Sequence, residues 1–201
     1  MITKWIAAAA LLLASSAPAL AEDCAERVAR LHVWWYENPE PGIGHVVSAT
    51  KGQPATDGEM HFVANGHYML KQFVPAGGWY LTHDGTTWQS TDGGASWKKL
   101  YSFDQEDTWQ KGLETVKQQA STVRNAVCGE DVIDGETVDT LEADMTNTIN
   151  ATYEIHDKYW VRRSDERAVR TETLTTGLGP DTFFTQTWTK APDLTIPPAP
   201  Q

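Results

Sequence analysis

The sequence lacks the short motifs that mark most catalytic and cofactor sites. It has no Gly-x-Ser-x-Gly nucleophile elbow, no glycine-rich phosphate loop, and no His-x-His or His-Glu-x-x-His spacing. We therefore predict no catalytic residues, no cofactor and no metal site. An acidic glycosidase pair has no spacing rule in sequence, so a glycan-acting enzyme stays open as an alternative.

The chain also lacks an apolar run long enough to cross a bilayer. Residues 1–21 instead have the three parts of a cleavable signal peptide: Lys4, a short apolar stretch at 5–14, and small residues at 19–21. The apolar stretch is about half of the ~20 residues that a spanning helix needs. We predict cleavage after Ala21, a periplasmic or secreted protein, and no stable membrane insertion.

Cysteine is scarce, with only Cys24 and Cys128 in the whole chain. Glu22 and Asp23 stand where a lipobox needs small uncharged residues, so Cys24 is not a lipidation site. In an oxidising compartment a disulfide between the two cysteines is the default, worth about 4–5 kcal/mol in the chain-entropy model. The alternatives are free thiols or a redox pair, which the long separation disfavours.

Positive charge is in deficit, because 16 lysines and arginines face 27 aspartates and glutamates, a formal net charge of −11. Removal of Lys4 with the signal peptide makes it −12. An acidic surface repels nucleic acids and anionic membranes, so neither is a predicted partner.

Two stretches repeat apolar residues with helical spacing. In residues 24–36 the apolar positions step by four, three and four. Residues 104–123 form the longer pattern, with acidic residues at its start and basic residues late, as the helix dipole favours. The stripes are Cys24, Val28, Leu31 and Trp35 in the first, and Trp109, Leu113, Val116, Ala120, Val123 and Val127 in the second.

The rest of the chain predicts strands and tight turns. Asn65-Gly66, Asp84-Gly85 and Asp134-Gly135 each separate β-prone segments, which is the strongest short hairpin signal. The order is a helix, about six strands, a long helix and about five strands. We predict an α+β fold: a strongly curved antiparallel sheet, a half-open barrel, covered by helices. It forms one domain over residues 22–190, followed by a proline-rich tail at 191–201.

Residues 90–97 fit the Asp-box pattern Ser/Thr-x-Asp-x-Gly-x-Ser/Thr-Trp at every fixed position. The physics is that of a turn: Asp92 accepts backbone N–H groups, Gly94 takes a positive φ, and Trp97 packs on the hairpin. A single copy in a chain of this length indicates a hairpin and not glycosidase chemistry. Among the histidines, His61 and His67 flank a turn and could approach each other, but we interpret them as surface residues.

Eight tryptophans follow the signal peptide. Core and hairpin packing accounts for most of them, while a functional interpretation has several lining an apolar pocket between sheet and helices. Trp34 and Trp35 are adjacent on a helix and cannot both point the same way. The candidate cavity residues are Trp35, Trp79, Trp88, Trp109, Leu113, Val116 and Trp160.

Four segments, residues 58–62, 79–88, 159–170 and 192–198, resemble the strand, hairpin and terminal patterns of the LolA/LolB-like group. This group comprises periplasmic lipoprotein carriers and their lipid-binding relatives. The resemblance implies a curved sheet closed by helices around an apolar cavity. It also implies a non-enzymatic periplasmic protein that binds a lipid or another hydrophobic small molecule. The alternatives are a carbohydrate-binding or glycan-acting protein, and an interaction module of the cell envelope whose protein partner is unknown.

Overall fold

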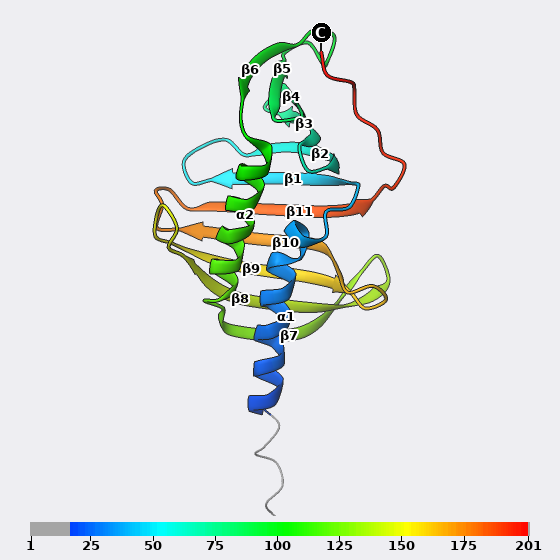
Figure 1. Ribbon diagram of the computed structural model, residues 1–201. Helices are drawn as coiled ribbons and strands as arrows, with labels where there is room; N and C mark the ends of the chain where they lie inside the picture. The colour runs from blue at the N-terminus through cyan, green and yellow to red at the C-terminus, as the bar shows by residue number, and fades with distance from the viewer. Residues whose placement is uncertain (1–16, 201) are drawn as a thin grey trace, which may run out of the picture.

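The computed structural model describes residues 17–200, which form two helices and one antiparallel sheet of eleven strands (Figure 1). The predicted order of a helix, six strands, a helix and five strands is confirmed. The elements are α1 (Ala17–Glu37), β1 (Gly42–Thr50), β2 (Thr56–Ala64), β3 (His67–Val74), β4 (Trp79–His83), β5 (Thr86–Ser90), β6 (Lys98–Ser102), α2 (Gln105–Ala120), β7 (Arg124–Ile133), β8 (Glu136–Asn147), β9 (Tyr153–Arg162), β10 (Arg167–Thr176) and β11 (Thr182–Lys190).

The sheet consists of two meanders. Strands β1 to β6 pair in sequence order, strands β7 to β11 do the same, and β1 joins the two halves by pairing with β11. Strands β6 and β7 are the two edges, so the sheet stays open and does not close into a barrel. The predicted fold class, a curved antiparallel sheet with helices over it, is confirmed.

The predicted tight turns lie where the dipeptides stand. Asp84-Gly85 joins β4 to β5 with φ values of 46° and 69°, and Asp134-Gly135 joins β7 to β8 with φ values of 51° and 83°. Both central residues of a type I′ turn need positive φ, which Asp tolerates and Gly adopts freely. These turns fix the register of the flanking strands.

The Asp-box residues form the loop between β5 and β6, as predicted. Asp92 accepts hydrogen bonds from the backbone N–H of Ser96 at 2.9 Å and from the hydroxyl of Ser90 at 2.7 Å. Gly94 has a φ of 94°, and its Cα faces the rings of Trp79 and Trp97. Hydrogen bonds from Ser90 and Ser96 hold the pKa of Asp92 far below its usual range.

Both helices lie on one side of the sheet, which we call the inner face (Figure 1). Helix α1 packs on β7 and β8, while α2 packs on α1 and β8. The core beneath α1 contains Val28, Leu141 and Tyr159, with Leu31 packed against it. The predicted disulfide is present and ties Cys24 of α1 to Cys128 of β7, with Cα atoms 5.7 Å apart.

Helix α2 begins as predicted but ends earlier. Asp104 is its N-cap and accepts a hydrogen bond from the N–H of Asp107 at 3.0 Å. The helix ends at Ala120 rather than at Val123, and Val127 lies on the edge strand β7 with 62% of its surface exposed. The prediction of one stripe through Val127 was therefore wrong. Thr122 ends the stripe, because its hydroxyl and the Thr146 backbone exchange hydrogen bonds that start the sheet pairing.

Residues 1–16 of the predicted signal peptide lie outside the described residues. The proline-rich tail begins with a turn after β11, in which the N–H of Leu194 bonds to the carbonyl of Ala191 at 3.0 Å, and the N–H of Ala191 bonds to the carbonyl of Pro41 at 3.0 Å. Within residues 17–200, neither helix combines the length and the apolar character that crossing a bilayer requires.

Candidate functional site

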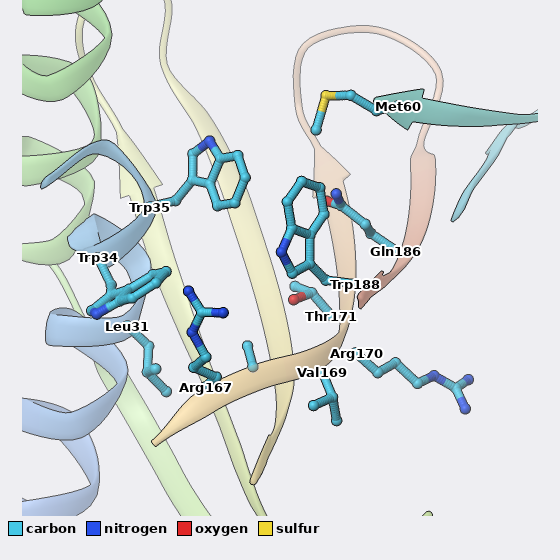
Figure 2. Close-up of a pocket in the computed structure, with 11 residues that line it drawn as sticks. Leu31, Trp34, Trp35, Met60, Arg167, Val169, Arg170, Thr171, Gln186 and Trp188 are labelled. Carbon is cyan, nitrogen blue, oxygen red and sulfur yellow. The ribbon is translucent and has the colours of Figure 1, made fainter. Parts of the chain in front are cut away.

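An apolar groove opens on the inner face beside the helices, in two adjoining parts. The inner hollow, of about 160 Å³, lies between α1 and strands β2, β10 and β11 (Figure 2). The second hollow, which we call the strand hollow, has about 320 Å³ and lies on the same inner face over strands β1 to β4 and β11. Both are lined by Met60 and Gln186, so they are neighbouring parts of one groove.

The inner hollow is walled by aromatic side chains from α1 and β11. Trp35 of α1 meets the ring of Trp188 edge-on at 4.5 Å and that of Phe62 at 4.8 Å, measured between centroids. Figure 2 shows Trp35 and Trp188 facing each other, with Met60 beyond them. Edge-to-face pairs at this spacing are favourable and hold the rings in fixed orientations.

The sequence of β1 explains how Trp188 lies so flat against the sheet. Gly44 is directly paired with Trp188, and a Cβ on Gly44 would come within 2.9 Å of the indole ring. A Cβ on Gly42 would come within 2.5 Å of the same ring. Since real Cβ atoms do not approach so closely, the two glycines are what allow the indole to form the groove wall.

The surface of the strand hollow is largely apolar and comes from side chains that point inward from successive strands. Leu70 and Tyr80 are directly paired across β3 and β4, and Phe184 and Val46 come from β11 and β1. Leu70 keeps 37% of its surface exposed although it lies on the helix-bearing side. An apolar concavity bordered by a few polar groups is the usual form of a small-molecule site, whose volume is about 300–1,000 Å³.

Two charged residues line the inner hollow, Arg167 and Arg170, and each is paired with a carboxylate, Arg170 with that of Glu172. The guanidinium of Arg167 is bonded to the carboxylate of Glu40 and lies over the ring of Trp34, 4.9 Å from the centroid. Burial lowers the pKa of Arg167 from its ordinary value. Because its charge is neutralised by Glu40, this end of the groove presents aromatic and aliphatic surface rather than a free cation.

A buried polar network joins both helices to the sheet next to the groove. His32 of α1 lies 3.1 Å from the carboxylate of Asp157 and 3.0 Å from the hydroxyl of Tyr159 through Nδ1, and 2.8 Å from Oε1 of Gln119 through Nε2. The side chain of His32 is 12% exposed and that of Asp157 only 3%.

The protonation of His32 follows from its neighbours. Asn147 donates its amide hydrogens to the carbonyls of Ile149 and Ala151, so its oxygen is free to accept from Nε2 of Gln119. Gln119 must then present Oε1, an acceptor, to Nε2 of His32. Both ring nitrogens of His32 therefore donate, and the imidazole is a cation beside Asp157.

The pKa directions agree with this arrangement. Burial by itself lowers the pKa of His32, but the hydrogen bond and charge of Asp157, with the hydrogen bond to Gln119, raise it overall. Burial and the charge of Asp157 raise the pKa of Tyr159 well above its usual value. The network thus consists of a charged pair and neutral donors that satisfy it.

The predicted cavity residues lie in three different places. Trp35 lines the inner hollow. On the opposite, outer face are Trp79, Trp88 and Trp160, because their strand neighbours Tyr80, Gln89 and Tyr159 point inward. Trp160 donates its N–H to Asp131 at 2.9 Å and carries Arg170 over its ring.

The three predicted residues of α2 do not line the groove. Trp109 packs against Tyr36 of α1 with the rings tilted by 45° and their centroids 4.8 Å apart, and it lines a separate hollow of about 190 Å³ with Phe62 and Tyr68. Leu113 and Val116 are half-buried along the same helix face and are not among the residues that line the groove.

Sequence reasoning missed most of the groove wall. Met60 and Trp188 stand between polar neighbours on their strands, and this period-two pattern was the signal that could have found them. Leu70 and Phe184 each follow another apolar residue, Met69 and Phe183, so alternation alone does not assign their faces. It does not say which strands lie side by side, and the pairing of β1 with β11 brings Trp188 to the groove from far along the chain.

No protein-family model and no curated protein matches the chain. Solved structures with a similar fold include a LolA superfamily protein from Nitrosomonas europaea (10% identity, 87% of this chain and 94% of that one, TM-score 0.36). MucB matches at 14% identity over 89% of this chain and 61% of that one, with a TM-score of 0.42.

A domain of an outer membrane lipoprotein-sorting protein from Vibrio parahaemolyticus matches at 10% identity, with 85% of this chain and 92% of that one covered and a TM-score of 0.33. The LolA-like group that the sequence resembles is thus named among these matches. At such identities the similarity concerns the fold alone.

Proposed function

We propose that this protein is a non-enzymatic binding protein for a lipid or another hydrophobic ligand, held in the groove between the curved sheet and the helices. The observation that carries the proposal is the groove itself, an apolar concavity on the inner face that runs from Leu70 and Phe184 to the aromatic wall of Trp35 and Trp188. Burial of such surface against an acyl chain contributes roughly 25 cal/mol for each Å² removed from water.

The polar groups at the groove favour an uncharged or weakly polar ligand body. Arg167 is neutralised by Glu40, and the N–H of Trp188 is buried without a hydrogen-bond partner within the described residues. Because that N–H has almost no exposed surface, it is not presented to a ligand, and the groove wall is apolar at Trp188. We therefore expect a ligand whose body is a hydrocarbon chain.

The proposed compartment is the periplasm or the extracellular space. This part of the proposal rests on the predicted signal peptide and on the disulfide between Cys24 and Cys128, a bond that persists in oxidising compartments. A carrier with an apolar groove would keep a poorly soluble ligand out of water in such a compartment.

The carbohydrate-binding alternative has less support. Sugar sites commonly use exposed aromatic faces, whereas all eight tryptophans from Trp34 onward are buried or half-buried. The surface that lines the groove is mainly apolar and offers little to satisfy sugar hydroxyl groups.

The test is titration of the delipidated protein with cis-parinaric acid, a fatty acid that fluoresces in an apolar site. We expect saturable binding. Leu70→Glu should weaken it at least tenfold, because the substitution places a carboxylate in the apolar strand hollow. Leu178→Glu is the matched control, since Leu178 is 61% exposed in the loop between β10 and β11.

Leu70 is partly exposed, so Leu70→Glu should keep the native circular dichroism spectrum. Non-saturable fluorescence in the unsubstituted protein, or equal losses in Leu70→Glu and Leu178→Glu, would refute the groove as the binding site.

A further inference from the structure

Two histidines face each other on the outer face of the sheet, remote from the groove. His67 begins β3 and His83 ends β4, and the antiparallel register pairs them directly. Their ring centroids are 4.8 Å apart. Asp84 follows His83 in the turn to β5, and its carboxylate lies 3.1 Å from Nε2 of His67. One ligand atom from each of the three residues lies within 4.8 Å of the others.

The ring nitrogens of both histidines are oriented by backbone carbonyls. Nδ1 of His67 lies 3.3 Å from the carbonyl of Asn65, and Nε2 of His83 lies 2.9 Å from the carbonyl of Pro197 in the tail. A carbonyl only accepts, so each of these nitrogens carries hydrogen. The other nitrogen of each ring is Nε2 of His67, beside the Asp84 carboxylate, and Nδ1 of His83; each becomes a ligand by giving up any proton it carries when the metal ion binds. A carbonyl on the far side of the imidazole is the usual second partner of a metal-binding histidine.

From this geometry we propose that His67, His83 and Asp84 bind a divalent transition-metal ion of the zinc type. Zinc takes imidazole nitrogen and carboxylate oxygen at about 2.0–2.2 Å in tetrahedral geometry. The three ligand atoms must draw together by roughly an ångström, and they can, because the Asp84 side chain is 83% exposed and that of His67 33%. Three protein ligands leave the fourth position to water or to a group from another molecule.

The other histidines of the outer face lack this combination. His45 pairs with Asp57 at 2.7 Å and His61 pairs with Glu59 at 2.8 Å, while His156 lies 2.8 Å from Asp144 and 3.2 Å from Glu142. Each of these is a single imidazole. The outer-face cluster of His67, His83 and Asp84 is distinguished by two imidazoles directed at one carboxylate. His45 therefore provides a matched control.

The experiment is isothermal titration of tag-free protein with zinc sulfate. We expect one ion per chain, with affinity at least tenfold weaker in His67→Gln, His83→Gln and Asp84→Asn, and unchanged in His45→Gln. Asn tolerates the positive φ of 46° at position 84, so Asp84→Asn keeps the turn. Circular dichroism and melting without zinc verify that each variant is folded.

Imidazole nitrogen NMR spectra provide a second measurement. Zinc should shift the ring resonances of His67 and His83 and leave those of His45 in place. The proposal is overturned if the folded protein shows no saturable zinc binding, if the three cluster variants bind as the unsubstituted protein does, or if His45→Gln abolishes binding. None of these results bears on the hydrophobic groove, which lies on the other face.

Discussion

The buried cation at His32 leads us to predict how the free energy of unfolding depends on pH. The perturbation is His32→Gln, which removes the positive charge that Asp157 faces at 3.1 Å. Removing one partner of a buried ion pair usually costs ~3–5 kcal/mol. Asp157 keeps hydrogen bonds from Tyr159 at 2.6 Å and Thr173 at 2.5 Å, so we expect the lower end of that range, about 3 kcal/mol at pH 6.

The sign of the pH dependence follows from the direction of the pKa shift. The pKa of His32 is raised in the folded protein, so the folded state holds this proton to a higher pH than the unfolded chain does. The stabilisation from protonated His32 is complete below the unfolded pKa of about 6.5 and is lost as pH rises through the folded value. The destabilisation caused by His32→Gln should therefore shrink between pH 6 and pH 8.5.

Urea denaturation at both pH values measures the effect. Subtracting the His32→Gln free energies of unfolding from those of the unsubstituted protein cancels the titration of the other groups. His45→Gln is the control, because it makes the same substitution at a half-exposed histidine that pairs with Asp57 and not with Asp157. Equal destabilisation by His32→Gln at pH 6 and pH 8.5 would show that His32 is not a buried cation.

Three other predictions concern the disulfide, the groove wall and the signal peptide. The Cys24–Cys128 bond spans 104 positions, and its reduction should lower the free energy of unfolding by about 4–5 kcal/mol. Urea titrations with and without reductant measure the difference, and a loss below about 1 kcal/mol would contradict the chain-entropy account. Gly44→Ala should displace the facing indole ring and weaken parinaric acid binding, whereas Gly129→Ala on the edge strand β7 should not. Mass spectrometry of the exported protein should find Glu22 at its N-terminus, and an intact Lys4 would refute cleavage there.

The elements of this fold could be predicted because their signals are local. The Asp84-Gly85 and Asp134-Gly135 turns need positive φ at two successive positions, and few dipeptides adopt that conformation. The stripe of α1 was recognisable from the spacing of its apolar residues, such as Cys24 and Val28, four positions apart. Both of these side chains are buried. Short-range rules of this kind do not depend on which strands become neighbours.

The candidate sites could not be predicted to the same extent because they depend on pairing and on strand faces. Trp160 and Tyr159 are adjacent in sequence and lie on opposite faces, so aromatic character alone did not say which one faces the helices. His67 and His83 lie opposite each other because of the register between β3 and β4. An irregular loop at 75–78 joins these two strands. The closer turn suggested His61 as the neighbour of His67, but His61 is paired with Met69.

The ties between the helices and the sheet are concentrated near one end of the sheet. The disulfide joins α1 to the edge strand β7, Arg27 pairs with Asp139 of β8 at 2.8 Å, and His32 pairs with Asp157 of β9. Trp35 lies one helical turn beyond His32, on the side of α1 that contacts Trp188 of β11 by ring packing. Ring contacts are individually weak compared with a covalent bond and a buried ion pair. The strong ties therefore fix the position of α1 over β7 to β9, and the groove that we propose as the ligand site lies where the helix meets the sheet through apolar contacts.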